Sequence, residues 1–377
     1  MTANVLSSLY DVSLMQAANM IRLCGSTNTT LLQGHMGIGK SSLLKHLAKM
    51  LPTHRPVDFD CTTKDLGDIL IPKIVEATQG DADCVRYVPN EELGVHLSGP
   101  VILMVDEFGK ANPAVKTAML RLMLERKTSG YTLHKDSIVF ATTNLGNEGV
   151  GDLLPAHARN RITVMRVRKP TAQEWVEDFA LEAGVDPTLI TWVLGNEAVF
   201  QSFEDCPDPG NNEFIFHPKA PGRVSFVTPR TLELASHWIK QRGHMGENEL
   251  TAALVGTIGT RAAADLSAYI RVGDQLPKQQ EIKDNPDTAP VPTNSMAVAM
   301  VVHRAMQTIE RSWTDAWMTY MLRLPKEAQG MFVNYVRRAT ERKNGAEGNK
   351  RLIEVNTNKK YMEFCLANNY MFAADKK

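Results

Sequence analysis

A short glycine-rich stretch near the amino terminus constrains this chain more than any other feature. Gly34, Gly39, Lys40 and Ser41 satisfy the spacing G-x-x-x-x-G-K-[ST], the pattern of a phosphate-binding loop, or P-loop. Glycines let backbone N–H groups turn toward the β- and γ-phosphates of a nucleotide, the lysine adds a positive charge, and the serine hydroxyl binds Mg²⁺. The sequence therefore predicts a site for ATP and magnesium.

The residues expected to contact the nucleotide form one continuous run, in which the second and third contribute backbone rather than side-chain chemistry. They are Gly34, His35, Met36, Gly37, Ile38, Gly39, Lys40, Ser41 and Ser42.

The context of the loop agrees with this interpretation. Residues 29–33 (TTLLQ) form a short β-type run before the loop, and residues 41–51 (SSLLKHLAKML) after it place leucines on one helical face. A strand, a glycine-rich loop and a helix in this order open an α/β nucleotide-binding fold. The positive end of the helix dipole would face the phosphates.

An acidic element follows the P-loop at the distance expected for such a fold. The continuous apolar run 101–105 (VILMV) is typical of a strand buried on both faces of a parallel sheet, and it ends at Asp106 and Glu107. Ligands bind at this edge of open α/β sheets. We expect Ser41 and Asp106 to hold the magnesium ion and Glu107 to polarise the attacking water.

The next buried strand also ends in a polar side chain. Residues 138–144 (IVFATTN) deliver Asn144 to the same edge of the sheet. Next to the strand of Asp106, this amide could reach both the γ-phosphate and the attacking water. The alternative is an asparagine that only caps the end of the strand.

The remaining pattern divides the chain. Residues 56–60 and 162–167 predict further strands, and two hairpins are expected: one between 71–76 and 84–89, the other between 130–133 and 137–144. After Pro170 the periodicity becomes helical. We therefore expect an α/β core at 1–170, a helical domain at 171–272, a proline-rich linker at 273–295 and a C-terminal helical extension at 296–377.

Composition argues against several classes of protein. The 42 basic and 42 acidic residues cancel, so the basic excess usual for nucleic-acid binding is missing. No apolar run approaches the roughly 20 residues of a membrane span, and the first residues lack the pattern of a secretion signal. The five cysteines show no zinc or disulfide spacing. We expect them to be buried thiols of a cytoplasmic protein.

In order, these motifs resemble those of the AAA+ ATPases, a superfamily of P-loop NTPases. Residues 101–115 (VILMVDEFGKANPAV), 140–144 (FATTN), 155–162 (PAHARNRI) and 228–232 (TPRTL) look most like the MoxR branch. Asp106 and Glu107 then match Walker B and Asn144 matches sensor 1. The two hairpins fit the helix-2 and pre-sensor-1 insertions of that clade.

Three arginines gain expected roles from the same resemblance. Arg161 matches the arginine finger, although relatives commonly carry Asp-Arg-Phe where this chain has residues 160–162 (NRI), so the choice between Arg159 and Arg161 stays open. Arg230 matches sensor 2 of the helical lid. The resemblance covers about residues 12–270, and the C-terminal extension matches nothing in the branch; its uneven basic charge fits a solvated face or a partner surface.

The resemblance implies an enzyme that hydrolyses ATP to ADP and phosphate with Mg²⁺ and remodels a partner protein. It also implies a homo-oligomeric ring, most often a hexamer, and a partner with a von Willebrand A domain. The alternatives are a nucleic-acid motor or loader, against which the neutral charge argues, and a scaffold that binds ATP without hydrolysing it, against which Glu107 argues.

Overall fold

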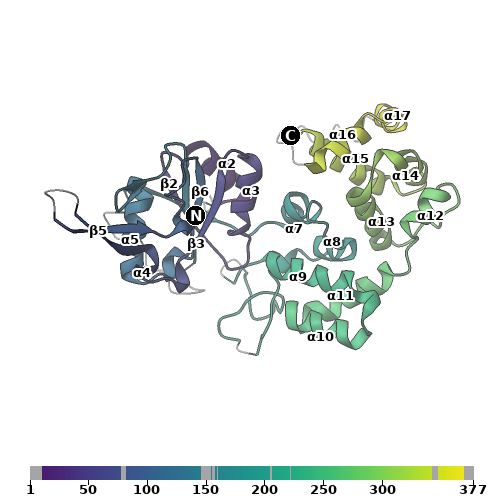
Figure 1. The fold of residues 1–377 in the computed structure, drawn as a ribbon. Helices are drawn as coiled ribbons and strands as arrows, with labels where there is room; N and C mark the ends of the chain where they lie inside the picture. Colours follow the sequence, from purple (N-terminus) through teal and green to yellow (C-terminus); the bar gives the residue numbers. More distant parts are fainter. Residues whose placement is uncertain are drawn as a thin grey trace, which may run out of the picture. The chain divides into compact units, whose positions relative to one another are not determined.

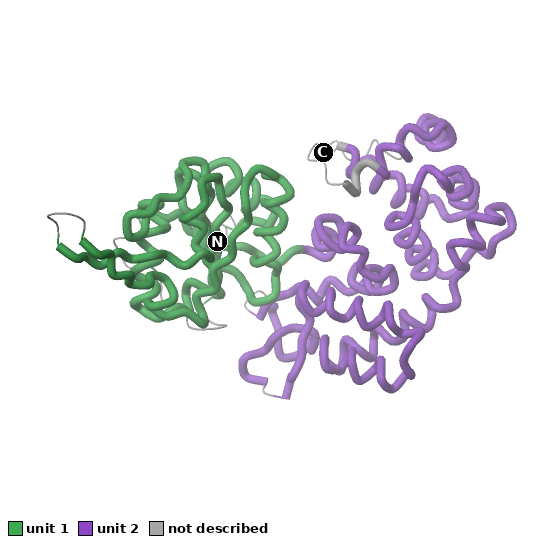
Figure 2. Tube along the Cα trace, in the orientation of Figure 1, with its two compact units in different colours: residues 1–170 green, residues 171–377 purple. Residues whose placement is uncertain are grey.

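The computed structural model describes residues 11–77, 82–145, 154, 158, 160–203, 206–220, 222–341 and 347–368. The chain divides into two compact units, Met1–Pro170 and Thr171–Lys377 (Figure 2). Each unit is considered by itself below.

The first unit is built on a six-stranded sheet in which every pair of neighbouring strands is parallel. Its order is β1-β10-β2-β9-β6-β3. The strands are β1 (Asp11–Val12), β2 (Thr29–Gly34), β3 (Arg55–Asp60), β6 (Val101–Asp106), β9 (Ile138–Asn144) and β10 (Ile162–Val167). The predicted α/β fold with a parallel sheet is confirmed.

The register of this sheet brings the sequence motifs together. Gly34 at the end of β2 pairs with Asn144 at the end of β9, and Asp106 at the end of β6 pairs with Asp60 at the end of β3. Strand β9 therefore lies between the strand that enters the P-loop and the strand that ends at Asp106. All seven of its residues are buried, because it has a neighbour on each side and helices on both faces.

Helices cover both faces of the sheet (Figure 1). Alternate residues of β2 point to opposite sides, so Leu32 packs with α2 (Leu14–Cys24) and α3 (Ser42–Met50), while Leu31 packs with α5 (Pro113–Glu125). Burial of each such leucine contributes about 1.5–3 kcal/mol.

Local signals set the ends of α5. The Asn112 side chain accepts a hydrogen bond from the Val115 N–H, Pro113 occupies the first turn, and Arg126 ends the helix in the left-handed region with φ 58°. The short helix α4 (Leu66–Ile69) precedes the first hairpin.

One expected hairpin is confirmed and the other is wrong. Strands β4 (Leu70–Val75) and β5 (Cys84–Pro89) pair antiparallel, and the hairpin extends away from the sheet (Figure 1). Within the expected second arm, Ile138–Asn144 instead form the parallel strand β9. The second hairpin joins β7 (Lys127–Thr128) to β8 (Tyr131–Thr132) through Ser129 and Gly130, both at positive φ, as a tight two-residue turn requires.

The part of the second unit that the structure describes contains helices joined by irregular segments, and no strand. Its α-helices are α7 (Ala172–Trp175), α8 (Pro187–Leu194), α9 (Pro229–Lys240), α10 (Glu247–Ile258), α11 (Thr260–Gly273), α12 (Gln279–Asp284), α13 (Ser295–Thr308), α14 (Thr314–Met321), α15 (Lys326–Glu341), α16 (Glu347–Asn356) and α17 (Lys359–Ala367). The π-helical η4 (Val176–Ala180) continues α7.

Short 3₁₀ helices connect elements in both units. They are η1 (Cys61–Thr63), η2 (Glu91–Leu93), η3 (Phe108–Lys110), η5 (Glu197–Phe200), η6 (Arg242–His244) and η7 (Arg311–Trp313).

A single hydrophobic cluster joins the helices of the second unit, from Ala172 to Phe364. The segment 273–295, expected as a linker, contains α12 and adds Ile282 and Ala289 to this cluster. Its prolines interrupt the helices without separating two cores.

All five cysteines are free thiols, but the expectation that they are buried is wrong for most of them. Only Cys61 is buried, while Cys24 and Cys84 are exposed. Cys84 lies on the projecting hairpin, where neither face is covered by a helix. No helix within the described ranges is long and apolar enough to span a membrane.

Candidate active site

The P-loop residues connect β2 to α3 at the carboxyl edge of the sheet. Gly37 and Gly39 have φ of 72° and 102°, which side chains other than glycine rarely tolerate. A Cβ on Gly34 would lie 2.7 Å from Ile38 Cδ1 and 2.9 Å from the Val167 carbonyl oxygen. These glycines therefore allow the chain to turn tightly against β10 and into the helix.

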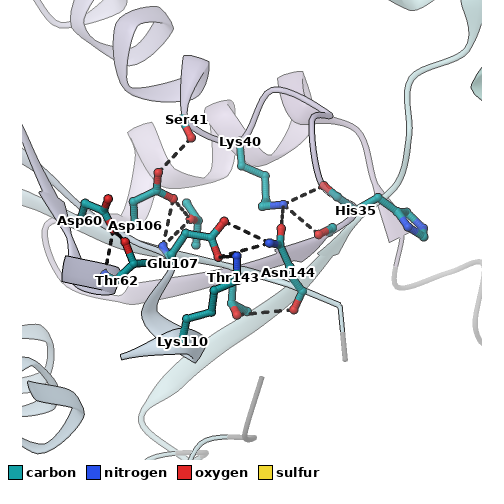
Figure 3. A network of polar contacts seen from close by, with 12 residues as sticks. His35, Lys40, Ser41, Asp60, Thr62, Asp106, Glu107, Lys110, Thr143 and Asn144 are labelled. Atoms are coloured by element: carbon teal, nitrogen blue, oxygen red, sulfur yellow. Dashed lines mark hydrogen bonds and ion pairs between the residues drawn. The ribbon is translucent and has the colours of Figure 1, made fainter. Parts of the chain in front are cut away.

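Lys40 is held inside this turn. Its side chain is buried, and its Nζ donates three hydrogen bonds of 2.8 Å each, to the carbonyl oxygens of Gly34 and His35 and to Asn144 Oδ1 (Figure 3). Burying an ammonium group is costly unless it is fully hydrogen-bonded. The P-loop and the tip of β9 supply the required acceptors.

Asp106 is bound through both carboxylate oxygens. Its Oδ2 accepts a hydrogen bond of 2.9 Å from Ser41 Oγ, and its Oδ1 accepts from the Thr142 hydroxyl and from the Glu107 N–H. The serine of the P-loop and the aspartate of β6, both predicted to hold magnesium, thus meet directly.

Glu107 occupies a strained position beside them. Its φ of 52° lies in the left-handed region, which costs a residue with a side chain on the order of 1–3 kcal/mol. Its two carboxylate oxygens accept hydrogen bonds of 3.1 and 3.2 Å from Asn144 Nδ2, and Lys110 Nζ lies 3.1 Å from Oε2. Figure 3 shows that Asn144 bridges Lys40 and Glu107.

The surroundings of Asp106 are strongly acidic. Burial, and then the carboxylates of Asp106, Asp60 and Glu92, raise the pKa of Asp58 to about 6. Burial followed by the charge of Asp60 raises the pKa of the Cys61 thiol to about 12, so this thiol is protonated and unreactive at neutral pH. Negative charge gathered at a strand end favours a cation there.

These donors and acceptors fit Mg²⁺ and a nucleotide. A hydroxyl and a carboxylate, Ser41 and Asp106, are oxygen ligands of the kind that magnesium takes, and it uses few protein ligands because phosphates and waters supply the rest. Lys40 and the amino terminus of α3 provide positive charge for phosphates.

Arg161 lies at the opposite edge of the sheet. It immediately precedes β10, whose first residue, Ile162, pairs with Thr29 at the start of β2, whereas Val167 pairs with Gly34 at the P-loop. The five residue steps from Ile162 to Val167 separate the two edges by about 16 Å. Arg161 is exposed and lines a pocket of about 530 Å³ that includes Asn28 and Glu125.

A second arginine at this edge has a different environment. Arg126, partly buried, donates to Thr29 Oγ1 and to the carbonyl oxygens of Gly25 and Met123. Burial lowers its pKa to about 10, which leaves it charged at neutral pH. It ties the end of α5 to the start of β2 and the end of α2.

The other two predicted arginines lie elsewhere. Arg230 is exposed in the first turn of α9 in the second unit, after the N-cap Thr228 and Pro229. Arg159 lies outside the described residues. The roles assigned to Arg159, Arg161 and Arg230 stay predictions.

Sequence reasoning missed two residues that contact the acidic pair, Thr142 and Lys110. Thr142 precedes Asn144 by two positions, so both side chains lie on the same face of β9. A polar residue at that spacing in an otherwise apolar strand was a usable signal. Lys110 follows Glu107 by three residues, and the contact depends on η3, which the sequence did not predict.

Comparison with known proteins finds only weak similarity. No family model and none of the curated proteins matches the chain. Among solved structures, the Holliday junction branch migration motor RuvB of Thermotoga maritima is similar at 17% identity over 80% of this chain and 82% of its own, with a TM-score of 0.34.

Two other solved structures have similar scores. A Cytophaga hutchinsonii protein provisionally described as an ATPase matches at 15% identity over 86% of this chain and 81% of its own, with a TM-score of 0.33. Hsp104 in its closed state, with ATPγS and casein, matches at 24% identity over 48% of this chain and 38% of its own, with a TM-score of 0.34. At these scores we draw neither fold nor function from the similarity.

Proposed function

We propose that this protein is an ATPase of the AAA+ superfamily, most like the MoxR branch, that hydrolyses ATP to ADP and phosphate with Mg²⁺. One observation carries the proposal: Lys40, Asn144 and Glu107 form a continuous hydrogen-bonded chain next to the Ser41–Asp106 pair. Three segments distant in the sequence, the P-loop and the ends of β6 and β9, supply these side chains.

Each side chain has a separate task. Lys40 would bind the β- and γ-phosphates, and Asn144 would orient the attacking water between itself and Glu107. Glu107 would accept the proton of that water as it attacks the γ-phosphate. Ser41 and Asp106 would hold the magnesium ion, which neutralises charge on the phosphates when bound.

The order of strands supports the superfamily. The strand of Asn144 lies between the P-loop strand and the strand of the acidic pair, which places its terminal amide within reach of both. A direct pairing of β2 with β6 would leave no position for it.

We infer further that the protein assembles as a ring, most simply a hexamer. The support is the position of Arg161, which lies at the sheet edge opposite its own P-loop. Arginine fingers supplied by a neighbouring subunit are a known device for stabilising the transition state. A closed ring would give every site a neighbour.

The partner is proposed on resemblance alone. Within the MoxR branch, it would be a protein with a von Willebrand A domain, remodelled in the cytoplasm. The equal numbers of basic and acidic residues favour a protein partner over nucleic acid.

The experiment that tests the proposal is phosphate release from ATP by the purified protein. We expect turnover that requires Mg²⁺ and stops when EDTA is added. Absence of turnover at every protein concentration, including those at which subunits associate, would contradict an ATPase function. Co-purification of the native protein with its partner, followed by identification of that partner, tests the remodelling role.

A further inference from the structure

Thr142 is hydrogen-bonded to both members of the acidic pair. It is completely buried in the middle sheet strand β9. Its hydroxyl donates to Asp106 Oδ1 and accepts a hydrogen bond of 3.4 Å from the Glu107 N–H. A hydroxyl has one donor and two acceptor sites, so this group satisfies two neighbours at once.

The first consequence concerns Asp106. With Oδ1 fixed by Thr142 and the Glu107 N–H, only Oδ2 faces the P-loop, where it meets Ser41 Oγ. The carboxylate is thereby held in one rotamer before any ion arrives. Groups that orient a metal ligand in this way are typically worth 10–100-fold in metal affinity or activity.

The second consequence concerns the backbone of Glu107. Its left-handed conformation is unfavourable for a residue with a side chain, and its N–H is bound by Thr142 and Asp106. This conformation turns the chain into η3 and presents the Glu107 carboxylate to Asn144. Thr142 and Asn144, two residues apart on β9, thus secure the backbone and the side chain of the same glutamate.

We propose that Thr142 is a positioning residue that sets the orientation of the magnesium-holding carboxylate of Asp106 and the backbone conformation of Glu107. The inference rests on the proposed ATPase function and adds a residue to the same site. Thr142 would act through Asp106 and the backbone of Glu107. Removal of its hydroxyl should alter the Mg²⁺ dependence and the turnover, and it should leave the affinity of the P-loop for the nucleotide phosphates unchanged.

The test compares Thr142→Ser with Thr142→Ala, because both lose the methyl group and differ in the hydroxyl alone. Thr142→Val keeps the shape and loses the hydroxyl. Thr30→Val is the matched control, since Thr30 is a buried threonine on the neighbouring strand β2, toward the other edge of the sheet. The measurements are kcat, the Mg²⁺ concentration for half-maximal activity, and binding of a fluorescent ATP analogue in EDTA.

We expect Thr142→Ala and Thr142→Val to lower kcat, to raise the Mg²⁺ concentration for half-maximal activity, or both. The combined change should be about 10–100-fold. Thr142→Ser should stay within about threefold of wild type, and nucleotide binding in EDTA should be unchanged in all variants. Equal behaviour of the serine and alanine variants would overturn the proposal, as would an equal loss of analogue binding in EDTA. If the valine variant does not fold, the serine–alanine pair still decides.

The two levels of inference fail differently. An active wild type and an active Thr30→Val variant, combined with an unaffected Thr142→Ala variant, would remove only the role of Thr142. An inactive wild type would remove the proposed function and this role with it.

Discussion

The two edges of the six-stranded sheet treat positive charge in opposite ways. At the carboxyl edge, the buried Lys40 ammonium has three acceptors, one of which links it to Glu107. At the amino edge, the Arg161 guanidinium is exposed, and the described residues give its side chain no hydrogen bond or ion pair. The polar groups of the carboxyl edge thus bind one another, whereas the described part of the chain offers the Arg161 guanidinium no such partner.

Arg126 shows that exposure is not general at the amino edge. Its guanidinium donates hydrogen bonds to the carbonyl oxygens of Gly25 and Met123 and to Thr29 Oγ1, and so joins secondary-structure elements. Arg161, immediately before the neighbouring strand β10, makes no such side-chain contact with the described residues. We therefore expect a substitution at the carboxyl edge to impair the nucleotide site of the same subunit. A substitution of Arg161 should instead impair the site of a neighbouring subunit.

Lys40→Ala should have the largest effect. It removes the cation for the phosphates and leaves three acceptors without their donor. Loss of a buried charged partner typically costs about 2–5 kcal/mol, roughly 30-fold or more in affinity, and turnover should vanish. Titration with a fluorescent ATP analogue measures the affinity, and Lys45→Ala, an exposed lysine on α3, is the control. Wild-type affinity in the Lys40 variant would refute the P-loop assignment.

Glu107→Gln should separate binding from chemistry. Glutamine keeps the shape of the side chain and leaves Asp106 and Ser41 in place, but it cannot accept a proton. Turnover should fall by about 10²–10⁴-fold, the usual contribution of a general base, with ATP affinity retained. Phosphate release and analogue binding, measured side by side, check this, with Glu91→Gln as the exposed control. Normal turnover would require another base.

Arg161→Ala tests the amino edge. If the arginine completes a neighbour's site, turnover should fall by about 10³-fold or more with little change in ATP binding. The control is Arg121→Ala, a mainly exposed arginine on α5 that pairs with Glu125.

Mixing experiments sharpen this prediction. Arg161→Ala subunits keep Glu107, and Glu107→Gln subunits keep Arg161, so an interface between them can combine the two intact halves. Partial activity should therefore return when the two inactive variants are mixed. If no activity returns although mixed assemblies form, the arginine acts within its own subunit, and the comparison between the two edges loses its meaning for catalysis.

The carboxyl edge was predictable because its signals are local in sequence. The P-loop spacing, the apolar run before Asp106 and the position of Asn144 each depend on a few consecutive residues, and parallel pairing brings their ends to one edge. The contact of Thr142 with Asp106 depends on the register between β6 and β9, which cannot be derived from the sequence of either strand alone.

The errors have the same physical origin. The turn before residues 137–144 favours a hairpin in the sequence, although an apolar strand buried on both faces is typical of the middle of a parallel sheet. The proline-rich segment 273–295 suggested a linker, but prolines end helices without preventing Ile282 from packing into a core. In both cases distant partners decided the outcome.

Arg230 offers the smallest effect and extends the comparison to the helical unit. It lies near the amino terminus of α9, where a positive charge is unfavourable against the helix dipole by about 0.3 kcal/mol or more. A residue that is locally unfavourable at this position is a candidate for a contact made only with ATP, as the sensor 2 resemblance implies.

Arg230→Ala should then lower turnover about tenfold, the value of one hydrogen bond to a charged group, while slightly raising the melting temperature. Lys240→Ala, at the other end of the same helix, should slightly lower the melting temperature and leave turnover alone. Hydrogen exchange in α9 should differ between ATP and ADP in the wild type and not in the Arg230 variant. Unchanged turnover together with an intact exchange difference would show that Arg230 is only a surface arginine.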